Sequence, residues 1–139
     1  AIAKLRNMLL EGKRYNIIIW LGVNDLKYNS ASRYFEEFIN LATELQDQKF
    51  YIVSVGPVRN NAKATCNNSQ INKFNEELKE LIRSSGIGNL EYIDLSDYDL
   101  QVQKYDSAGL HYGYQDYRNI HDIIETALEE SKALKLNNR

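Results

Sequence analysis

The sequence has one cysteine, one proline and no long apolar run. Cys66 alone excludes an internal disulfide framework and any zinc site built from several thiolates, and His111 and His121 make a poor metal set. The longest apolar run covers residues 17–21, far short of the roughly 20 residues that span a bilayer. We therefore expect no disulfide, no metal site and no membrane-spanning helix.

Neither sign of charge dominates. The 17 basic and 19 acidic side chains leave a formal charge of −2, and the basic ones form no dense cluster. Such a balance gives no electrostatic footprint for nucleic acid or an anionic membrane, so neither is expected as a partner. The length of 139 residues suits a single domain, residues 1–139.

Apolar side chains recur with helical and strand periods along the chain. Some segments carry an apolar stripe at helical spacing, and others are short runs rich in β-branched residues. The sequence predicts helices near residues 2–11 and 31–47, a third that starts near Asn68 or Ser69 and ends toward residues 84–86, and a last one whose apolar stripe covers residues 117–128. Strands are predicted at residues 17–21, 50–55 and 90–95. The polar tail, residues 135–139, is expected to fray.

Strands that alternate with helices predict an α/β fold, in which right-handed crossovers build an open parallel sheet. The continuous apolar run at residues 17–21 is typical of a strand covered on both faces. A sheet of three strands leaves this run at an edge, where an apolar strand is an aggregation hazard. We therefore expect that a partner supplies strands beside it, or that the chain is the C-terminal part of a larger domain.

Ligands of open α/β sheets bind outside the carboxyl ends of the strands, so a site is expected in the segments that follow them. Residues 22–25 read G-V-N-D, and the Asn24 amide can donate a hydrogen bond to a developing oxyanion. The long connection after the third strand ends at His111, which can act as a general base on the same rim.

Three segments follow one another along the chain: G-V-N-D at residues 22–25, V-S-V-G-P-V at 53–58, and G-L-H-Y at 109–112, which precedes the last amphipathic helix. They resemble blocks of the SGNH hydrolases, also called GDSL esterases and lipases. The resemblance implies a flavodoxin-like, three-layer α/β/α fold with five strands, of which three are present. It also implies a serine esterase with Asn24 as oxyanion-hole donor, His111 as general base and then acid, and no metal or organic cofactor.

Two parts of the family pattern have no counterpart. The G-D-S block with the nucleophilic serine is absent, as is the block with the oxyanion-hole glycine. We therefore expect the C-terminal portion of such a domain, with the serine carried by a missing N-terminal segment or a second chain. The family's aspartate three residues before the histidine is replaced by Ala108. Asp106 can substitute only if the loop brings it round; a Ser-His dyad, a backbone carbonyl as orienter or a less efficient site stay open.

The expected substrate is a small acyl group, such as acetyl on a carbohydrate, with Gly22 and Tyr112 among the substrate-binding residues. Tyrosines on the rim suit sugar rings, and the sequence has no long apolar lid. A chain without disulfides can function inside or outside the cell, and an extracellular or bacterial cell-surface location is favoured. The alternative is a non-catalytic α/β binding or interaction module. A phosphate-relay receiver domain is discounted because the acidic cluster for its metal ion is missing.

Simpler interpretations exist for each candidate residue. The side chains of Asn24 and Asp25 can close a turn by bonding their own backbone, and Asp25 is more typical of that role than of catalysis. His111 can be an ordinary polar residue near a helix start. Cys66 is typical of an inert small residue. Ser54 and Ser107 are poor nucleophiles by position, one within a strand and the other in a loop.

Overall fold

The computed structural model describes residues 14–27, 29–60, 62 and 66–137. The helix predicted at residues 2–11 lies outside the described residues. Within the described residues there are three strands, two short 3₁₀ helices and three α-helices. They are β1 (Asn16–Trp20), η1 (Val23–Lys27), α2 (Ala31–Glu44), β2 (Lys49–Val53), α3 (Asn68–Ser84), β3 (Leu90–Ile93), η2 (Leu95–Tyr98) and α4 (Tyr114–Asn137).

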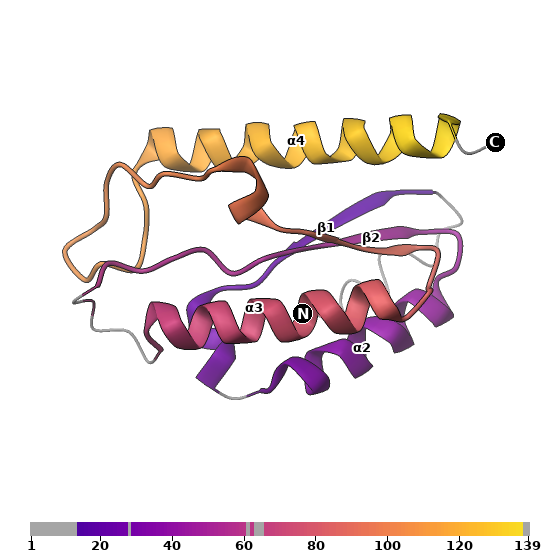
Figure 1. The fold of residues 1–139 in the computed structure, drawn as a ribbon, viewed down its shortest axis with the longest axis horizontal. Coiled ribbons are helices and arrows are strands. Elements are labelled where there is room, and N and C mark those ends of the chain that lie inside the picture. Colours follow the sequence, from indigo (N-terminus) through magenta and orange to yellow (C-terminus); the bar gives the residue numbers. More distant parts are fainter. Residues whose placement is uncertain (1–13, 28, 61, 63–65, 138–139) are drawn as a thin grey trace.

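The three strands form one parallel sheet in the order β1-β2-β3. In its register Ile19 pairs with Ile52, and Ile52 pairs with Tyr92. Helices α2 and α3 cover one face of the sheet, and α4 lies across the other face (Figure 1). The predicted α/β class with a parallel sheet between helical layers is confirmed.

Two apolar cores hold these layers together. The first lies between the sheet and helices α2 and α3, around Leu41, Ile52 and Leu78. The second joins α4 to β2 and β3, through Tyr51, Ile93, Leu95 and Ile120 among others. The apolar stripes predicted on α2 and α3 therefore face the first core, as their spacing indicated. In the described part of the chain, no helix has an apolar stretch long enough to cross a bilayer.

The helix ends follow from capping side chains. Ser30 caps α2, since its Oγ accepts a hydrogen bond from the backbone N–H of Arg33 at 3.2 Å. Asn67 and Gln70 form a reciprocal capping box at the start of α3, with both bonds at 2.9 Å. The predicted start of α3 is thus confirmed. Helix α4 extends to Asn137, three residues into the tail that is expected to fray, and residues 138–139 lie outside the described residues.

Helix α2 ends at Glu44, three residues before the predicted end. The cause is Asn89, which precedes β3. Its side-chain amide donates to the carbonyls of Ala42 at 2.9 Å and Gln48 at 3.0 Å, and so holds the turn between α2 and β2. Strand β3 likewise ends at Ile93, because Asp94 caps the following turn and accepts from the Ser96 N–H at 2.9 Å.

The prediction that residues 17–21 are covered on both faces is wrong. Ile17 and Ile19 pack against the first core. Ile18 and Trp20 point to the opposite face, and each stays 37% exposed. The reason lies in the position of α4, which packs over β2 and β3 and leaves the same face of β1 only partly covered.

Candidate functional site

A cavity of about 200 Å³ opens where β1 and β2 end and the loop before α4 passes them. It is built by three segments that lie far apart in the sequence. Four of the five predicted site residues line it, namely Gly22, Asn24, His111 and Tyr112. The fifth, Asp106, is not among the lining residues but lies in the loop that presents His111. The ends of β1 and β2, where the carboxyl-end rule predicts a site, therefore do border a cavity.

The turn after β1 is closed by Asp25. Its carboxylate accepts the Gly22 N–H at 2.8 Å and the Tyr34 hydroxyl at 3.3 Å, while its own N–H donates to the Gly22 carbonyl at 3.1 Å. The structural role predicted for Asp25 is confirmed. Asn24 is exposed at the rim, and its side chain makes no hydrogen bond to the described residues. Its amide is therefore available to a ligand.

The wall beside β2 is formed by Gly56 and Tyr112. The Tyr112 hydroxyl donates to the carbonyl of Pro57 at 2.6 Å, and a Cβ at position 56 would overlap that hydroxyl. Burial raises the pKa of Tyr112 well above its usual value, so the hydroxyl stays protonated and can donate. Asn75 fixes the strand exit, since its side chain bonds both the N–H and the carbonyl of Val55 at 2.9 Å. Glycine is thus required at position 56 by close approach.

Asp106 shapes the loop that carries His111. Its carboxylate accepts the backbone N–H groups of Leu110 at 2.9 Å and His111 at 3.3 Å, and its own N–H donates to the His111 carbonyl at 2.9 Å. The Leu110 N–H is the main reason why the pKa of Asp106 lies below its usual value. Gly109 turns the loop with a positive φ of 76°. Asp106 therefore fixes the backbone of His111.

The His111 imidazole is exposed and makes no hydrogen bond to any described residue. No bond joins it to the Asp106 carboxylate, whose observed partners are backbone N–H groups. Ala108, at the position of the family aspartate, offers no polar side chain. The structure thus shows no hydrogen bond by which Asp106 would orient the His111 imidazole. That Asp106 takes the place of the family aspartate stays a prediction.

No serine or cysteine is among the described residues that line the cavity. Ser54 is buried, and its hydroxyl accepts the Leu95 N–H at 2.9 Å. Ser107 lies in the His111 loop, where its carbonyl accepts from the Arg59 guanidinium at 3.0 Å. Cys66 packs against the first core. The described residues thus supply a donor and a base at this cavity but no nucleophile.

Aromatic side chains form the outer wall of the cavity. Trp20 lies 6.4 Å from Tyr112 and 6.1 Å from Tyr117 between ring centroids, and Tyr105 lies 5.6 Å from Tyr112. The Trp20 indole N–H donates to the Ser54 carbonyl at 3.1 Å. Trp20 was not among the predicted site residues, although its position at the carboxyl end of the first predicted strand was a usable signal.

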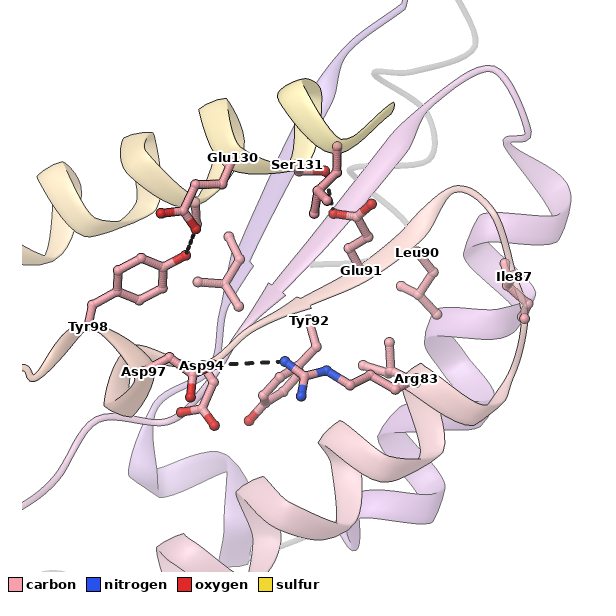
Figure 2. Close-up of a pocket in the computed structure, with 15 residues that line it drawn as sticks. Arg83, Ile87, Leu90, Glu91, Tyr92, Asp94, Asp97, Tyr98, Glu130 and Ser131 are labelled. Carbon is pink, nitrogen blue, oxygen red and sulfur yellow. Dashed lines mark hydrogen bonds and ion pairs between the residues drawn. The ribbon is translucent and has the colours of Figure 1, made fainter. Parts of the chain in front are cut away.

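A second, larger cavity of about 510 Å³ lies along β3, between α3 and α4 (Figure 2). Tyr98 from η2 and Glu130 from α4 meet at one side of it, with the hydroxyl 2.8 Å from the carboxylate. Burial and the Glu130 carboxylate raise the pKa of Tyr98 to about 12. Arg83 and Asp97 lie 3.9 Å apart at another side. None of the predicted site residues lines this cavity.

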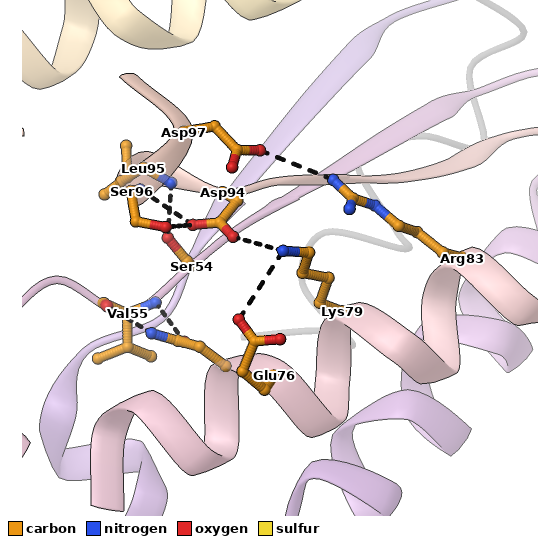
Figure 3. Close-up of polar contacts among 10 residues, drawn as sticks. Ser54, Val55, Glu76, Lys79, Arg83, Asp94, Leu95, Ser96 and Asp97 are labelled. Carbon is orange, nitrogen blue, oxygen red and sulfur yellow. Dashed lines mark hydrogen bonds and ion pairs between the residues drawn. The ribbon is translucent and has the colours of Figure 1, made fainter. Parts of the chain in front are cut away.

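A polar network holds the exit of β3 (Figure 3). The Asp94 carboxylate accepts the Ser96 hydroxyl at 2.6 Å and the Lys79 ammonium at 2.9 Å, and Lys79 also lies 3.8 Å from Glu76. Burial raises the pKa of Asp94, but the bonds from Ser96 and Lys79 outweigh it and hold the pKa below its usual value. Each oxygen of Asp94 is occupied, so this acid serves the fold. No sequence motif indicated this network.

One group of described residues has the composition of a metal site. His121, Asp122 and Glu125 lie on α4 with their ligand atoms within 4.8 Å of one another, and all three side chains are exposed. An exposed i, i+1, i+4 group of this kind is what a solvated helix face commonly presents, and nothing else at this place points to an ion.

Comparison of the chain with protein-family models and with curated proteins gives no match. The resemblance to the SGNH hydrolases therefore depends on the three motifs and on their placement in the fold.

Proposed function

We propose that this chain is the C-terminal portion of a serine esterase of the SGNH type. One observation carries the proposal: the turn with Asn24 and the loop with His111, far apart in sequence, meet at one cavity at the carboxyl ends of the strands. A donor and a basic side chain at the mouth of one cavity are the groups that acyl transfer needs besides a nucleophile.

In the proposed reaction, a serine hydroxyl attacks the ester carbonyl while His111 takes its proton. The Asn24 amide, with backbone N–H groups, holds the negative oxygen of the tetrahedral intermediate. The alcohol leaves with the proton from His111, and the acyl group stays on the serine. Water then attacks this ester while His111 takes its proton, and the acid is released as the serine oxygen recovers the proton. Asp106 acts through the loop, because its carboxylate fixes the backbone N–H of His111 at 3.3 Å.

The proposed substrate carries a small acyl group, such as acetyl on a carbohydrate. A cavity of about 200 Å³ suits such a group better than a long acyl chain. Gly22 lines the cavity without a side chain that would narrow it, and Tyr112 supplies an aromatic wall. The proposed chemistry requires no metal or organic cofactor.

The second candidate is a non-catalytic α/β binding module. The absence of serine and cysteine from the described lining favours it. The same cavity, with its aromatic wall and the available Asn24 amide, would then bind a small polar ligand without hydrolysis.

The test uses the protein purified from its native host. Denaturing mass spectrometry identifies any second polypeptide, a fluorophosphonate probe labels a reactive serine, and p-nitrophenyl acetate reports hydrolysis. A second, labelled polypeptide together with hydrolysis would support the esterase. A folded 139-residue chain that is alone, unlabelled and inactive would overturn the esterase in favour of the binding module.

Variants then assign the roles. Removing an oxyanion-hole donor costs about 10²–10³ in turnover, so Asn24→Ala should lower kcat by that factor with little change in KM. His111→Ala should lower kcat at least as much. The matched control is His121→Ala, because this histidine is exposed on α4 and lies outside the cavity. Equal activity of all three variants would exclude the proposed roles.

A further inference from the structure

The cavity along β3 has a buried hydroxyl without a partner in its wall. Tyr92 is 8% exposed, and its hydroxyl makes no hydrogen bond to any described residue. Burial and the nearby Asp94 carboxylate raise the pKa of this hydroxyl, and the nearby Ser54 hydroxyl offsets the rise only in part, so the group stays protonated. Buried hydroxyls without a partner destabilise a fold and are rare. The Tyr92 hydroxyl therefore indicates a partner from outside the chain.

The wall on the side of α3 offers donors. Figure 2 shows Tyr92 extending from β3 toward α3, on the side where the Arg83 side chain lies. Among the described residues, the Arg83 guanidinium has one ion pair, at 3.9 Å from Asp97, so it keeps N–H donors for a ligand. This side of the cavity thus presents the Tyr92 hydroxyl and the Arg83 guanidinium as donors, and the Asp97 carboxylate as an acceptor.

The wall on the side of α4 offers acceptors. One oxygen of Glu130 accepts the Tyr98 hydroxyl at 2.8 Å, and its other oxygen makes no hydrogen bond to the described residues. The Ser131 hydroxyl donates to Glu91 at 2.7 Å and keeps lone pairs that can accept. Donors and acceptors therefore face the same cavity from two helices.

The main chain of β3 adds one group of each kind. The carbonyls of Asn89 and Ile93 accept the N–H groups of Phe50 at 2.8 Å and Ser54 at 2.9 Å, so these two residues face β2. Main-chain groups of alternate residues in a parallel strand point to opposite sides. The N–H and the carbonyl of Tyr92 therefore point to the outer side of β3, along which the cavity lies.

We infer that the β3 cavity binds a neutral ligand with several adjacent hydroxyl groups, the chemistry of a sugar unit. A hydroxyl both donates and accepts, which matches a wall that mixes donors and acceptors. The rings of Tyr92 and Tyr98, with Ile93 and Ala127, can contact the apolar face of a sugar ring. The volume of about 510 Å³ lies within the range of small-molecule sites, about 300–1,000 Å³. The inference is independent of the proposed esterase, because the two cavities share no lining residue.

Charged ligands fit this cavity less well. An ammonium ion would bond Glu130 and Asp97, but it carries no acceptor for the Tyr92 hydroxyl and would lie near the Arg83 charge. A carboxylate would accept from Tyr92 and would face the like charges of Asp97 and Glu130. A neutral ligand with hydroxyl groups avoids both conflicts.

The experiment is an amide-shift titration of the ¹⁵N-labelled 139-residue chain with the methyl glycosides of glucose, galactose and mannose. We expect saturable shifts of the Tyr92 and Ser131 amides with at least one glycoside, while the Asn24 and His111 amides stay unchanged. Tyr92→Phe should weaken binding about 3- to 10-fold, the loss of one hydrogen bond, without lowering the melting temperature, because it removes a hydroxyl that has no partner in the chain.

Tyr51→Phe is the matched control, since Tyr51 is 5% exposed, lies on β2 and does not line this cavity. It should bind like the parent. Glu130→Gln is a second test that keeps an acceptor for the Tyr98 hydroxyl, and it should weaken binding about 10-fold because a charged acceptor is lost.

Four results would overturn the inference. The first is no saturable shift with any of the three glycosides, and the second is a set of shifts confined to the Asn24 and His111 amides, which would place the sugar in the candidate site. The third is binding of benzylammonium or benzoate at β3 in place of the glycosides. The fourth is unchanged glycoside binding by both Tyr92→Phe and Glu130→Gln. None of these results bears on the proposed esterase, which depends on hydrolysis and on a labelled serine.

Discussion

The two edges of the sheet are built differently. Strand β3 is four residues long and carries Glu91, which bonds Lys49 and Ser131, each at 2.7 Å, and helices α3 and α4 flank it. Strand β1 is five residues long, carries no charge and exposes Ile18 and Trp20. Short length, charge and flanking helices are how native proteins protect an edge. Strand β3 therefore has the features of a true edge, and β1 those of an interior strand.

The strand exits differ in the same sense. At the exit of β3, Asp94 is occupied by Ser96 and Lys79. At the exit of β1, the Asn24 side chain has no bond to the described residues. The saturated exit stabilises the fold, while the unsaturated exit leaves a donor for a ligand. The proposed chemistry therefore lies on the open side of the sheet, next to the exit of β1.

The largest effect should separate two isoleucines on the same face of the sheet. Ile93 on β3 is 5% exposed under α4, whereas Ile18 on β1 is 37% exposed. Ile93→Ala should lower the free energy of unfolding by about 2–5 kcal/mol, because it leaves a cavity. Ile18→Ala should cost about 1 kcal/mol or less. Urea denaturation of both variants measures the difference, and equal losses would show that β1 is covered in the folded chain.

The next effect concerns the occupied exit of β3. Asp94→Asn should lower the free energy of unfolding at pH 7 by about 1–3 kcal/mol, because Lys79 loses the closer of its two carboxylate partners. The folded pKa of Asp94 is lowered, so its stabilisation is present above the usual value of 3.8 and is lost as the pH falls below it. The variant should therefore lose less stability than the parent as the pH falls from about 7 to about 3, a range that includes the usual pKa of an aspartate.

The matched control for this pH series is Asp122→Asn, since Asp122 is an exposed acid on α4. Its acid sensitivity should equal that of the parent. Identical pH dependence of the parent and Asp94→Asn would show that the bonds to Ser96 and Lys79 contribute nothing to acid stability, and the contrast between the two exits would then be unfounded.

The smallest effect on stability should come from exchanging the character of the two edges. Glu91→Ile removes the charge from β3 and should cost only about 0.2–1 kcal/mol, because Glu91 is partly solvated. It should nevertheless increase self-association of the chain, while Ile18→Lys should decrease it. Sedimentation velocity over a concentration series measures both changes. Self-association that responds to Glu91→Ile but not to Ile18→Lys would contradict the assignment of β1 as the open edge.

Local patterns predicted most of the fold. The spacing of apolar residues predicted the helices α2 and α3, whereas the capping box of Asn67 and Gln70 at the start of α3 came from the structure. The shortened end of α2 was out of reach, because Asn89 sits far along the chain and bonds the last carbonyls of the helix. The partial exposure of Ile18 and Trp20 on β1 could not be predicted either, since it depends on where α4 packs. Continuous apolar sequence indicates that a strand needs cover, and says nothing of whether the chain supplies it.

The candidate site divides in the same way. The carboxyl-end rule brought Gly22, Asn24 and His111 to one cavity, because it depends only on the order of the elements. The bonding of Asp106 to the backbone of Leu110 could not be read from spacing, since a carboxylate five residues before His111 can face either the ring or the loop. That choice depends on the loop conformation, which Gly109 sets with its positive φ.

Trp20 is the sole tryptophan of the chain. It lines the cavity and also belongs to the partly exposed face of β1. All indole fluorescence of the molecule therefore comes from one place. Its emission responds to the polarity around the ring, so a ligand that dries the cavity or a segment that covers β1 would shift the spectrum to the blue. Tyr112 and Tyr117 lie close enough to pass excitation energy to it. The protein thus carries its own optical reporter at the junction of its cavity and its open edge.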